Sequence, residues 1–238
     1  MAIKFGLLIV AAYLLGSVPI AYIVARWVRG IDIRQYGSGN VGASNVVTVV
    51  SKWWSVPVIL FDLGKGVVLV WVAQLLGLGV AQQVAVGLAA IIGHNWPVFL
   101  GFNGGRGWLT LVGVALFLAP GPTLILLVFA FLFAIFRQLA LGAILAVAAL
   151  PVFSWFLAQP FGIEEPLPVT IGFLVIFLIT VLRRLTAPQT PVTASVSRGQ
   201  LIVNRLLFDR DIRDREAWIH QLPPRVSSGK QQEKRKKG

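Results

Sequence analysis

The chain has 238 residues, of which 57% are hydrophobic and only 13% are charged, and its net charge is +12. Soluble domains carry about twice that share of charged residues, so the composition excludes an ordinary water-soluble fold. The absence of cysteine excludes disulfides and thiolate metal ligands. Thirteen of the 21 Lys and Arg residues lie at or after Arg183, behind the last apolar run. This placement favours contact with an anionic membrane surface over binding of nucleic acid.

Long apolar runs dominate the first three quarters of the sequence. A helix needs about 20 apolar residues to cross the roughly 30 Å of hydrocarbon in a bilayer. The sequence predicts an all-α, polytopic membrane protein with seven such segments, at residues 5–27, 55–76, 80–100, 108–119, 121–137, 139–158 and 168–184. The fourth segment ends at Pro120-Gly121-Pro122, because proline cannot continue a helix. The first is too long for the core of a signal peptide, so it is interpreted as a retained span.

The loops between these segments alternate in charge. Lys and Arg occur in loops 28–54 and 101–107 and at Arg137, whereas loops 77–79 and 159–167 contain neither. Cytoplasmic loops of membrane proteins are enriched in Lys and Arg. The sequence therefore predicts an N-terminus outside and a C-terminus in the cytoplasm, which requires an odd number of crossings.

A change in composition predicts a domain boundary near residue 185. Residues 1–185 form the expected membrane domain, and residues 186–238 form a basic cytoplasmic tail. Within the tail, residues 186–200 are rich in Thr, Ser, Pro and Gly, which is typical of a linker. Residues 201–222 mix aliphatic and charged side chains and predict an amphipathic helix on the surface. Residues 225–238 are predicted to be disordered.

Both of the basic loops contain closely spaced glycines. The clustered glycines are Gly37, Gly39, Gly42, Gly104, Gly105 and Gly107. Such spacing lets several backbone N–H groups converge on one anion. Ser38, Asn40 and Asn45 add neutral donors, and Arg106 adds a cation whose geometry suits a phosphate or a carboxylate. Tight turns between helices are the alternative explanation for either cluster alone.

Three ionisable residues are predicted at membrane depth. Asp62 and Lys65 lie three residues apart in the second apolar segment, so they share a helix face. Charged residues at that depth normally pair with each other and line a cavity or pathway, although a purely structural ion pair is the alternative. His94 ends the third segment beside the second glycine cluster and is, with Asp62, a candidate for proton handling. Together with the glycine loops, these residues predict a pocket for a phosphorylated anion.

Five sequence motifs follow one another along the membrane domain. They are Gly16-Ser17-Val18-Pro19, Gly37-Ser38-Gly39-Asn40-Val41-Gly42-Ala43-Ser44-Asn45, Phe61-Asp62-Leu63-Gly64-Lys65-Gly66, Gly93-His94-Asn95-Trp96-Pro97-Val98-Phe99 and Gly104-Gly105-Arg106-Gly107. In this order, and over a stretch from about Leu14 to Arg184, the sequence resembles the bacterial acyl-phosphate:glycerol-3-phosphate acyltransferase family. The resemblance implies a seven-span enzyme of the plasma membrane whose substrate loops face the cytoplasm. It also implies transfer of a fatty acyl group from acyl phosphate to glycerol 3-phosphate, which gives lysophosphatidic acid.

Acyl phosphate is already an activated anhydride, so this reaction requires no nucleophile from the enzyme, no metal and no cofactor. The site must hold two phosphates, align the hydroxyl with the carbonyl and stabilise the departing phosphate. The implied partners are acyl phosphate, glycerol 3-phosphate and membrane lipid, without nucleic acid. Catalytic roles are predicted for Ser38, Asp62, Lys65, His94 and Arg106. Substrate binding is predicted for the six clustered glycines, Asn40 and Asn45.

Three departures from the family pattern leave alternatives open. The family usually has arginine where Thr48 stands and lysine where Arg106 stands. Its His-Arg-x-Asn-Ile-x-Arg-Leu stretch after the last span is replaced here by the sequence from Arg183 to Ala187 and an apparent insertion. The alternatives are a divergent or inactive paralogue that takes another phosphorylated acceptor, and a permease for organic phosphates.

Overall fold

The computed structural model describes residues 1–219, and all regular secondary structure in this part of the chain is helical. Its α-helices are α1 (Ala2–Gly16), α2 (Ile20–Arg29), α3 (Ala43–Val49), α4 (Lys52–Leu75), α5 (Val80–Asn95), α6 (Trp108–Leu118), α7 (Pro120–Ile135), α8 (Leu139–Phe156), α9 (Pro166–Leu185), α10 (Arg198–Phe208) and α11 (Arg215–Ile219). Short 3-10 helices lie at η1 (Ile33–Gln35), η2 (Val98–Leu100) and η3 (Pro191–Ser195). The predicted all-α class is confirmed.

Seven apolar helical segments coincide with the seven that the sequence predicts. Five are long and apolar enough to cross a membrane, namely Ala2–Arg29, Lys52–Leu75, Val80–Leu100, Leu139–Phe156 and Pro166–Leu185. The other two, α6 and α7, are apolar but shorter. They meet at Pro120, the first residue of α7, where the sequence predicts the break. The described part of the chain is thus that of an all-α membrane protein with five long apolar segments. A separate crossing by each of the two shorter helices remains a prediction.

The first apolar segment is two helices where the sequence predicts one. Helix α1 ends at Gly16 and α2 begins at Ile20, immediately after Pro19. Proline has no N–H to donate to the preceding turn, and its ring clashes with that turn. The same four residues, from Gly16 to Pro19, form one of the motifs that carry the family resemblance.

Glycine allows the closest helix contacts. A Cβ on Gly66 of α4 would collide with the backbone of Thr110, and one on Gly113 of α6 would collide with the backbone of Leu63. Apolar side chains gain little from leaving lipid, so helices in a membrane associate largely through close packing of small residues. This glycine contact holds α4 against α6 and thereby fixes the start of α6, which directly follows the second glycine cluster.

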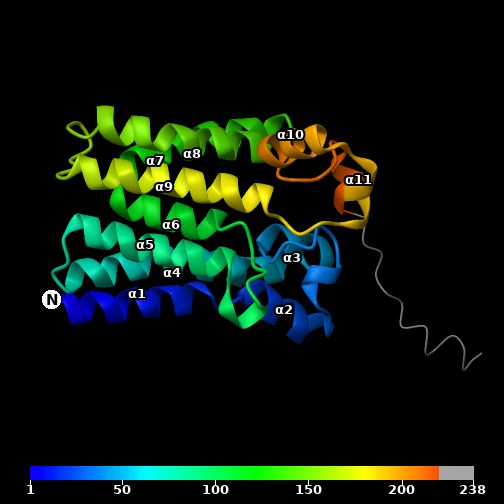
Figure 1. Ribbon diagram of the computed structural model, residues 1–238, viewed down its shortest axis with the longest axis horizontal. Coiled ribbons are helices and arrows are strands. Elements are labelled where there is room, and N and C mark those ends of the chain that lie inside the picture. Colours follow the sequence, from blue (N-terminus) through cyan, green and yellow to red (C-terminus); the bar gives the residue numbers. More distant parts are fainter. Residues whose placement is uncertain (220–238) are drawn as a thin grey trace, which may run out of the picture.

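The helices form one bundle with its loops divided between two ends. Helix α1 packs against α5, α4 against α6, α7 against α8, and α8 against α9, while α5 also contacts α9 and joins the two groups. Figure 1 shows α2, α3, α10 and α11 gathered at one end, with the N-terminus at the opposite end. Both glycine clusters lie at the end that carries α2 and α3, so the bundle brings them together.

Residues 186–219 pack against the bundle. The segment predicted as a linker contains η3. The amphipathic helix predicted over 201–222 is instead two helices in the described residues, α10 and the short α11, with a break at 209–214. Helix α10 contacts α8 and α9. Arg205 of α10 is buried and donates to Asp211 at 2.7 Å and to the carbonyl of Leu185 at 2.7 Å. The predicted disorder of residues 225–238 lies outside the described residues.

Candidate active site

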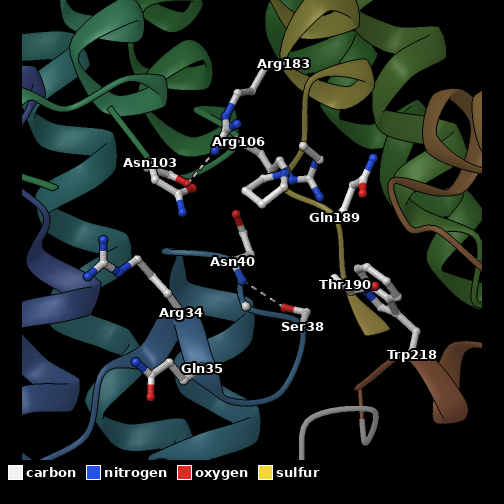
Figure 2. Close-up of a pocket in the computed structure, with 14 residues that line it drawn as sticks. Arg34, Gln35, Ser38, Asn40, Asn103, Arg106, Arg183, Gln189, Thr190 and Trp218 are labelled. Atoms are coloured by element: carbon white, nitrogen blue, oxygen red, sulfur yellow. Dashed lines mark hydrogen bonds between the residues drawn. The ribbon is translucent and has the colours of Figure 1, made fainter. Parts of the chain in front are cut away.

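A cavity of about 510 Å³ opens at the end of the bundle where the glycine clusters meet. We call it the loop cavity. Its lining residues are Arg34, Gln35, Ser38, Gly39, Asn40, Asn103, Gly104, Arg106, Arg183, Ala187, Pro188, Gln189, Thr190 and Trp218. In Figure 2, Ser38 and Asn40 face Arg106 and Arg183 across this space, and Gln189, Thr190 and Trp218 form one wall. The wall comes from the segment that the sequence predicts to be a linker and tail.

A second cavity of about 380 Å³ adjoins the first. We call it the arginine cavity, because Arg106, Arg137, Arg183, Arg184, Arg210 and Arg215 all line it. Its remaining lining residues are Ser38, Asn40, Ser44, Thr48, Trp108, Gln138, Leu139, Ala140, Ala143, Thr180, Phe208, Asp209, Trp218 and Ile219. Five residues line both cavities: Ser38, Asn40, Arg106, Arg183 and Trp218. We call these five the junction.

The first glycine cluster is a turn built around Asn45. The Asn45 amide donates to the carbonyls of Ile33 and Tyr36 at 3.2 and 3.0 Å, and its oxygen accepts from the N–H of Ser38 at 3.2 Å. Gly37 has a φ of +58°, and a Cβ there would collide with Asn45. Asn45 is buried and Gly37 is packed behind the turn, so both are scaffold. Their contacts turn Ser38 and its neighbours toward the cavities.

The second glycine cluster is held by an arginine from the last apolar helix. Arg183 is buried at the end of α9 and donates from Nε to the carbonyl of Gly105 at 2.8 Å and from Nη2 to the carbonyl of Gly104 at 2.7 Å. A Cβ on Gly105 would collide with the ring of His94, and one on Gly107 would collide with Asn95. The loop therefore lies flat between α5 and α9, and Arg106 extends from it into both cavities.

Asp62, Lys65 and His94 form a buried cluster beneath this loop. Lys65 Nζ lies 2.8 Å from Asp62 Oδ1 and 3.0 Å from His94 Nδ1, and His94 Nδ1 lies 3.4 Å from Asp62 Oδ1. The ion pair predicted from the three-residue spacing is confirmed. None of the three is among the described residues that line the loop cavity or the arginine cavity. Asp62 and His94 instead line a small void together with Gly104 and Gly105.

Arg34 sits on the rim of the loop cavity, where Asp32 balances its charge. It donates to the Asp32 carboxylate from Nη2 at 2.7 Å and from Nε at 3.0 Å, and from Nη1 to the carbonyl of Leu100 at 3.3 Å. This hydrogen bonding lowers the pKa of the Asp32 carboxyl and raises the pKa of Arg34. The pair is therefore charged at neutral pH, and through the carbonyl of Leu100 it links η1 to η2.

The structure brings part of the predicted site together and places the rest behind it. Ser38, Gly39, Asn40, Gly104 and Arg106 line a cavity. Of the other predicted residues, Gly37, Gly42, Asn45, Gly105 and Gly107 shape the loops, and Asp62, Lys65 and His94 lie beneath them. The cavity residues not predicted from the sequence include Arg34, Arg137, Arg183, Arg184, Gln189, Asp209 and Trp218. Two of these residues, Arg183 and Arg184, could have been predicted from the sequence, because they are adjacent arginines at the end of the last apolar segment.

Comparison with known proteins identifies the family of this chain. The family model described as glycerol-3-phosphate acyltransferase matches residues 6–188. Glycerol-3-phosphate acyltransferase 4 of Dehalococcoides mccartyi (strain CBDB1) is 50% identical over 216 residues, which are 91% of this chain and 93% of that protein. Glycerol-3-phosphate acyltransferase of Pseudomonas aeruginosa (strain PAO1) is 41% identical over 172 residues, 71% of this chain and 89% of that protein.

The fold is also that of a solved structure. The crystal structure of PlsY, an integral membrane glycerol 3-phosphate acyltransferase, in its glycerol 3-phosphate form superposes with a TM-score of 0.69 at 30% sequence identity. The superposition covers 89% of this chain and 96% of PlsY, so almost all of PlsY has a counterpart here. The family model, the curated relatives and the shared fold together show that this chain belongs to the membrane-integral glycerol-3-phosphate acyltransferase family.

Proposed function

We propose that this chain transfers a fatty acyl group from acyl phosphate to glycerol 3-phosphate, giving lysophosphatidic acid for phospholipid synthesis, and that the transfer occurs at the junction of the two cavities. The observation that supports this location is the pair of adjoining cavities with Arg106 and Arg183 between them. Two anionic substrates must meet with their reacting ends in contact, and adjoining basic cavities provide that arrangement. The family's activity supports this reaction, and the two adjoining cavities support this location for it.

In the transfer, the glycerol hydroxyl oxygen attacks the carbonyl carbon of acyl phosphate. An ester bond forms, the bond from that carbon to the phosphate oxygen breaks, and inorganic phosphate leaves with the hydroxyl proton. Negative charge builds on the departing phosphate, so a fixed cation beside it lowers the barrier. We assign this role to Arg106, with Ser38 and Asn40 as neutral donors on the opposite side of the junction.

Asp62, Lys65 and His94 act, in this proposal, through the loop above them. Their cluster adjoins Gly104 and Gly105, so in the proposed arrangement this loop lies between the cluster and the substrates. Arg183 holds the same loop from the other side through its two carbonyls. Because these contacts hold the loop from both sides, the Arg106 guanidinium keeps a fixed position facing Ser38 and Asn40.

The arginine cavity accounts for the departure at Thr48. Thr48 lines this cavity, and so do Arg137, Arg184 and Arg210. We infer that the positive charge that the family usually places at position 48 comes here from the turn between α7 and α8, the end of α9 and the turn after α10. This supports retention of a phosphorylated acceptor in spite of the missing arginine.

Charge placement supports an orientation with the N-terminus outside and the active site facing the cytoplasm of a plasma membrane. Between Arg26 and Arg184, every Lys and Arg except Lys65 lies in the loops or helix ends at the end of the bundle that holds the site. Cytoplasmic loops carry this excess. The proposed membrane domain is residues 1–185 with seven crossings, and residues 186–219 are cytoplasmic and complete the site.

Labelling of single cysteines tests this orientation. The natural chain has no cysteine, so Gln35→Cys and Glu164→Cys each introduce one reactive thiol at an exposed position, at opposite ends of the bundle. A membrane-impermeant maleimide is expected to label position 164 from outside intact cells, and position 35 only after the membrane is opened. Labelling of both positions from the same side would contradict the topology.

The activity itself is tested with purified protein in detergent. Acyl phosphate and glycerol 3-phosphate should give lysophosphatidic acid and inorganic phosphate in equal amounts. A panel of other phosphorylated acceptors, run in parallel, separates this activity from that of a paralogue with a different acceptor. Radiolabelled glycerol 3-phosphate offered to sealed vesicles of the same protein tests the permease alternative, for which uptake without acyl transfer is the distinguishing result.

A further inference from the structure

Asp209 is the one carboxylate among the described residues that line either cavity. It follows the last residue of α10 and lies in the left-handed region, with φ +56° and ψ +37°. Its Oδ1 atom lies 3.0 Å from Arg106 Nη1 and 4.0 Å from Arg184 Nε. A residue near the end of the described chain thus forms an ion pair with the arginine proposed to act on the departing phosphate.

The turn that carries Asp209 is held by a buried polar network. Asp211, two residues on, accepts from Arg205 at 2.7 Å and from the hydroxyls of Thr190 and Thr193. Its backbone carbonyl accepts from Asn204 at 3.0 Å. Buried polar groups that are fully paired fix a single local geometry. The position of the Asp209 carboxylate is therefore set by the packing of α10 and the turn.

Asp209 approaches Arg106 from the side of the arginine cavity. It lines the arginine cavity alone, whereas Arg106 lines both. Arg106 Nη1 and Asp209 Oδ1 are both buried, and neither makes a hydrogen bond to the described part of the chain. The two atoms therefore face each other as a charge pair, which leaves the other guanidinium nitrogens of Arg106 for the junction. Because Asp209 also faces Arg184, its charge offsets the mutual repulsion of arginines gathered there.

We propose that Asp209 is a positioning residue for acyl transfer, whose carboxylate holds the Arg106 guanidinium toward the junction. The proposal rests on the function proposed above. It adds a residue from the segment after the last apolar helix to the machinery that acts on the departing phosphate. Removing the carboxylate leaves Arg106 charged but free to turn away, so the loss should fall on kcat and leave the KM of either substrate almost unchanged.

The test uses Asp209→Asn and Asp209→Gly. Asparagine and glycine both tolerate a left-handed backbone, so neither substitution strains the turn and the lost carboxylate is the common change. With acyl phosphate and glycerol 3-phosphate, we expect kcat to fall about 10- to 100-fold in both variants. Asp209→Glu, which keeps the charge, is expected to recover part of that loss. Asp214→Asn is the matched control, since Asp214 is exposed and caps α11.

A double variant separates positioning from a general structural role. If Asp209 acts through Arg106, adding Asp209→Asn to Arg106→Ala causes no further loss of kcat, whereas a structural role makes the two losses multiply. Unchanged kcat in the single variants, or a lower KM that shows Asp209 competing with substrate phosphate, overturns the inference. Failure of the natural protein to acylate glycerol 3-phosphate would instead overturn the proposed function, so the two failures are distinct.

Discussion

Replacing Arg106 by alanine is expected to lower kcat about 100- to 1000-fold, the loss that follows removal of one donor aimed at developing charge. Arg106 is the cation at the junction that extends from the loop pinned by Arg183 and the Asp62–Lys65–His94 cluster. Its contact strengthens as the carbon–oxygen bond to phosphate breaks, so the loss should exceed any change in KM. The measurement is steady-state release of inorganic phosphate by purified protein at saturating levels of both substrates.

Arg106→Lys is the informative control, because the related family usually has lysine at this position. A single ammonium keeps the charge and loses the bidentate geometry, so we expect it to retain most of the activity that alanine abolishes. A drop in kcat as large as that of alanine would show that guanidinium geometry, and with it the pairing to Asp209, is obligatory. Equal activity of the alanine variant and the natural protein would remove Arg106 from the reaction.

Single alanine substitutions at Asp62 and Lys65 are expected to destabilise the protein by about 3–5 kcal/mol each, because each leaves the other charge buried and unpaired. The two side chains form a 2.8 Å ion pair and are only 3% and 4% exposed. The double substitution to alanine removes both charges and should cost less than the sum of the single losses. Unfolding in mixed micelles, followed by tryptophan fluorescence, measures the three free energies.

His94 belongs to the same cluster and provides a further test of the coupling between Asp62 and Lys65. It lies 3.0 Å from Lys65 and 3.4 Å from Asp62, so it remains as a partial partner in either single variant. His94→Ala in each single-variant background should therefore deepen the loss. Strictly additive losses for Asp62 and Lys65 in folded protein would show that the pair is not coupled, in spite of its geometry.

Hydropathy and the positions of proline predicted most of the helical segments correctly. Each apolar run became a helical segment, and Pro120 begins α7 where the sequence predicts the break. The break between Gly16 and Ile20 was missed, since hydropathy is continuous across it. Periodicity and composition indicate whether a helix is surrounded by water, protein or lipid. They change little when a single residue interrupts the hydrogen bonds of the helix.

The sequence predicted which loops form the site, but it did not predict the contacts between the residues of the site. Glycine spacing located both loops, and the three-residue spacing of Asp62 and Lys65 correctly predicted their pairing. The role of Arg183 depends on α9 passing a loop 78 residues away in sequence. The approach of Asp209 to Arg106 likewise depends on how α10 docks, and a sequence rich in Ser, Thr and charge does not specify docking.

The contact at the end of α1 affects the order in which the helices pack during synthesis. With 15 residues, α1 rises about 22 Å at 1.5 Å per residue, less than the thickness of the hydrocarbon. Its last carbonyl, on Gly16, accepts from Lys65, which the ribosome adds 49 residues later. A backbone group at that depth is costly until it is paired. We therefore expect α1 to be synthesised before α4, its partner at Gly16, exists. We expect α1 to remain loosely held at the translocon until α4 arrives and Lys65 can donate to the carbonyl of Gly16.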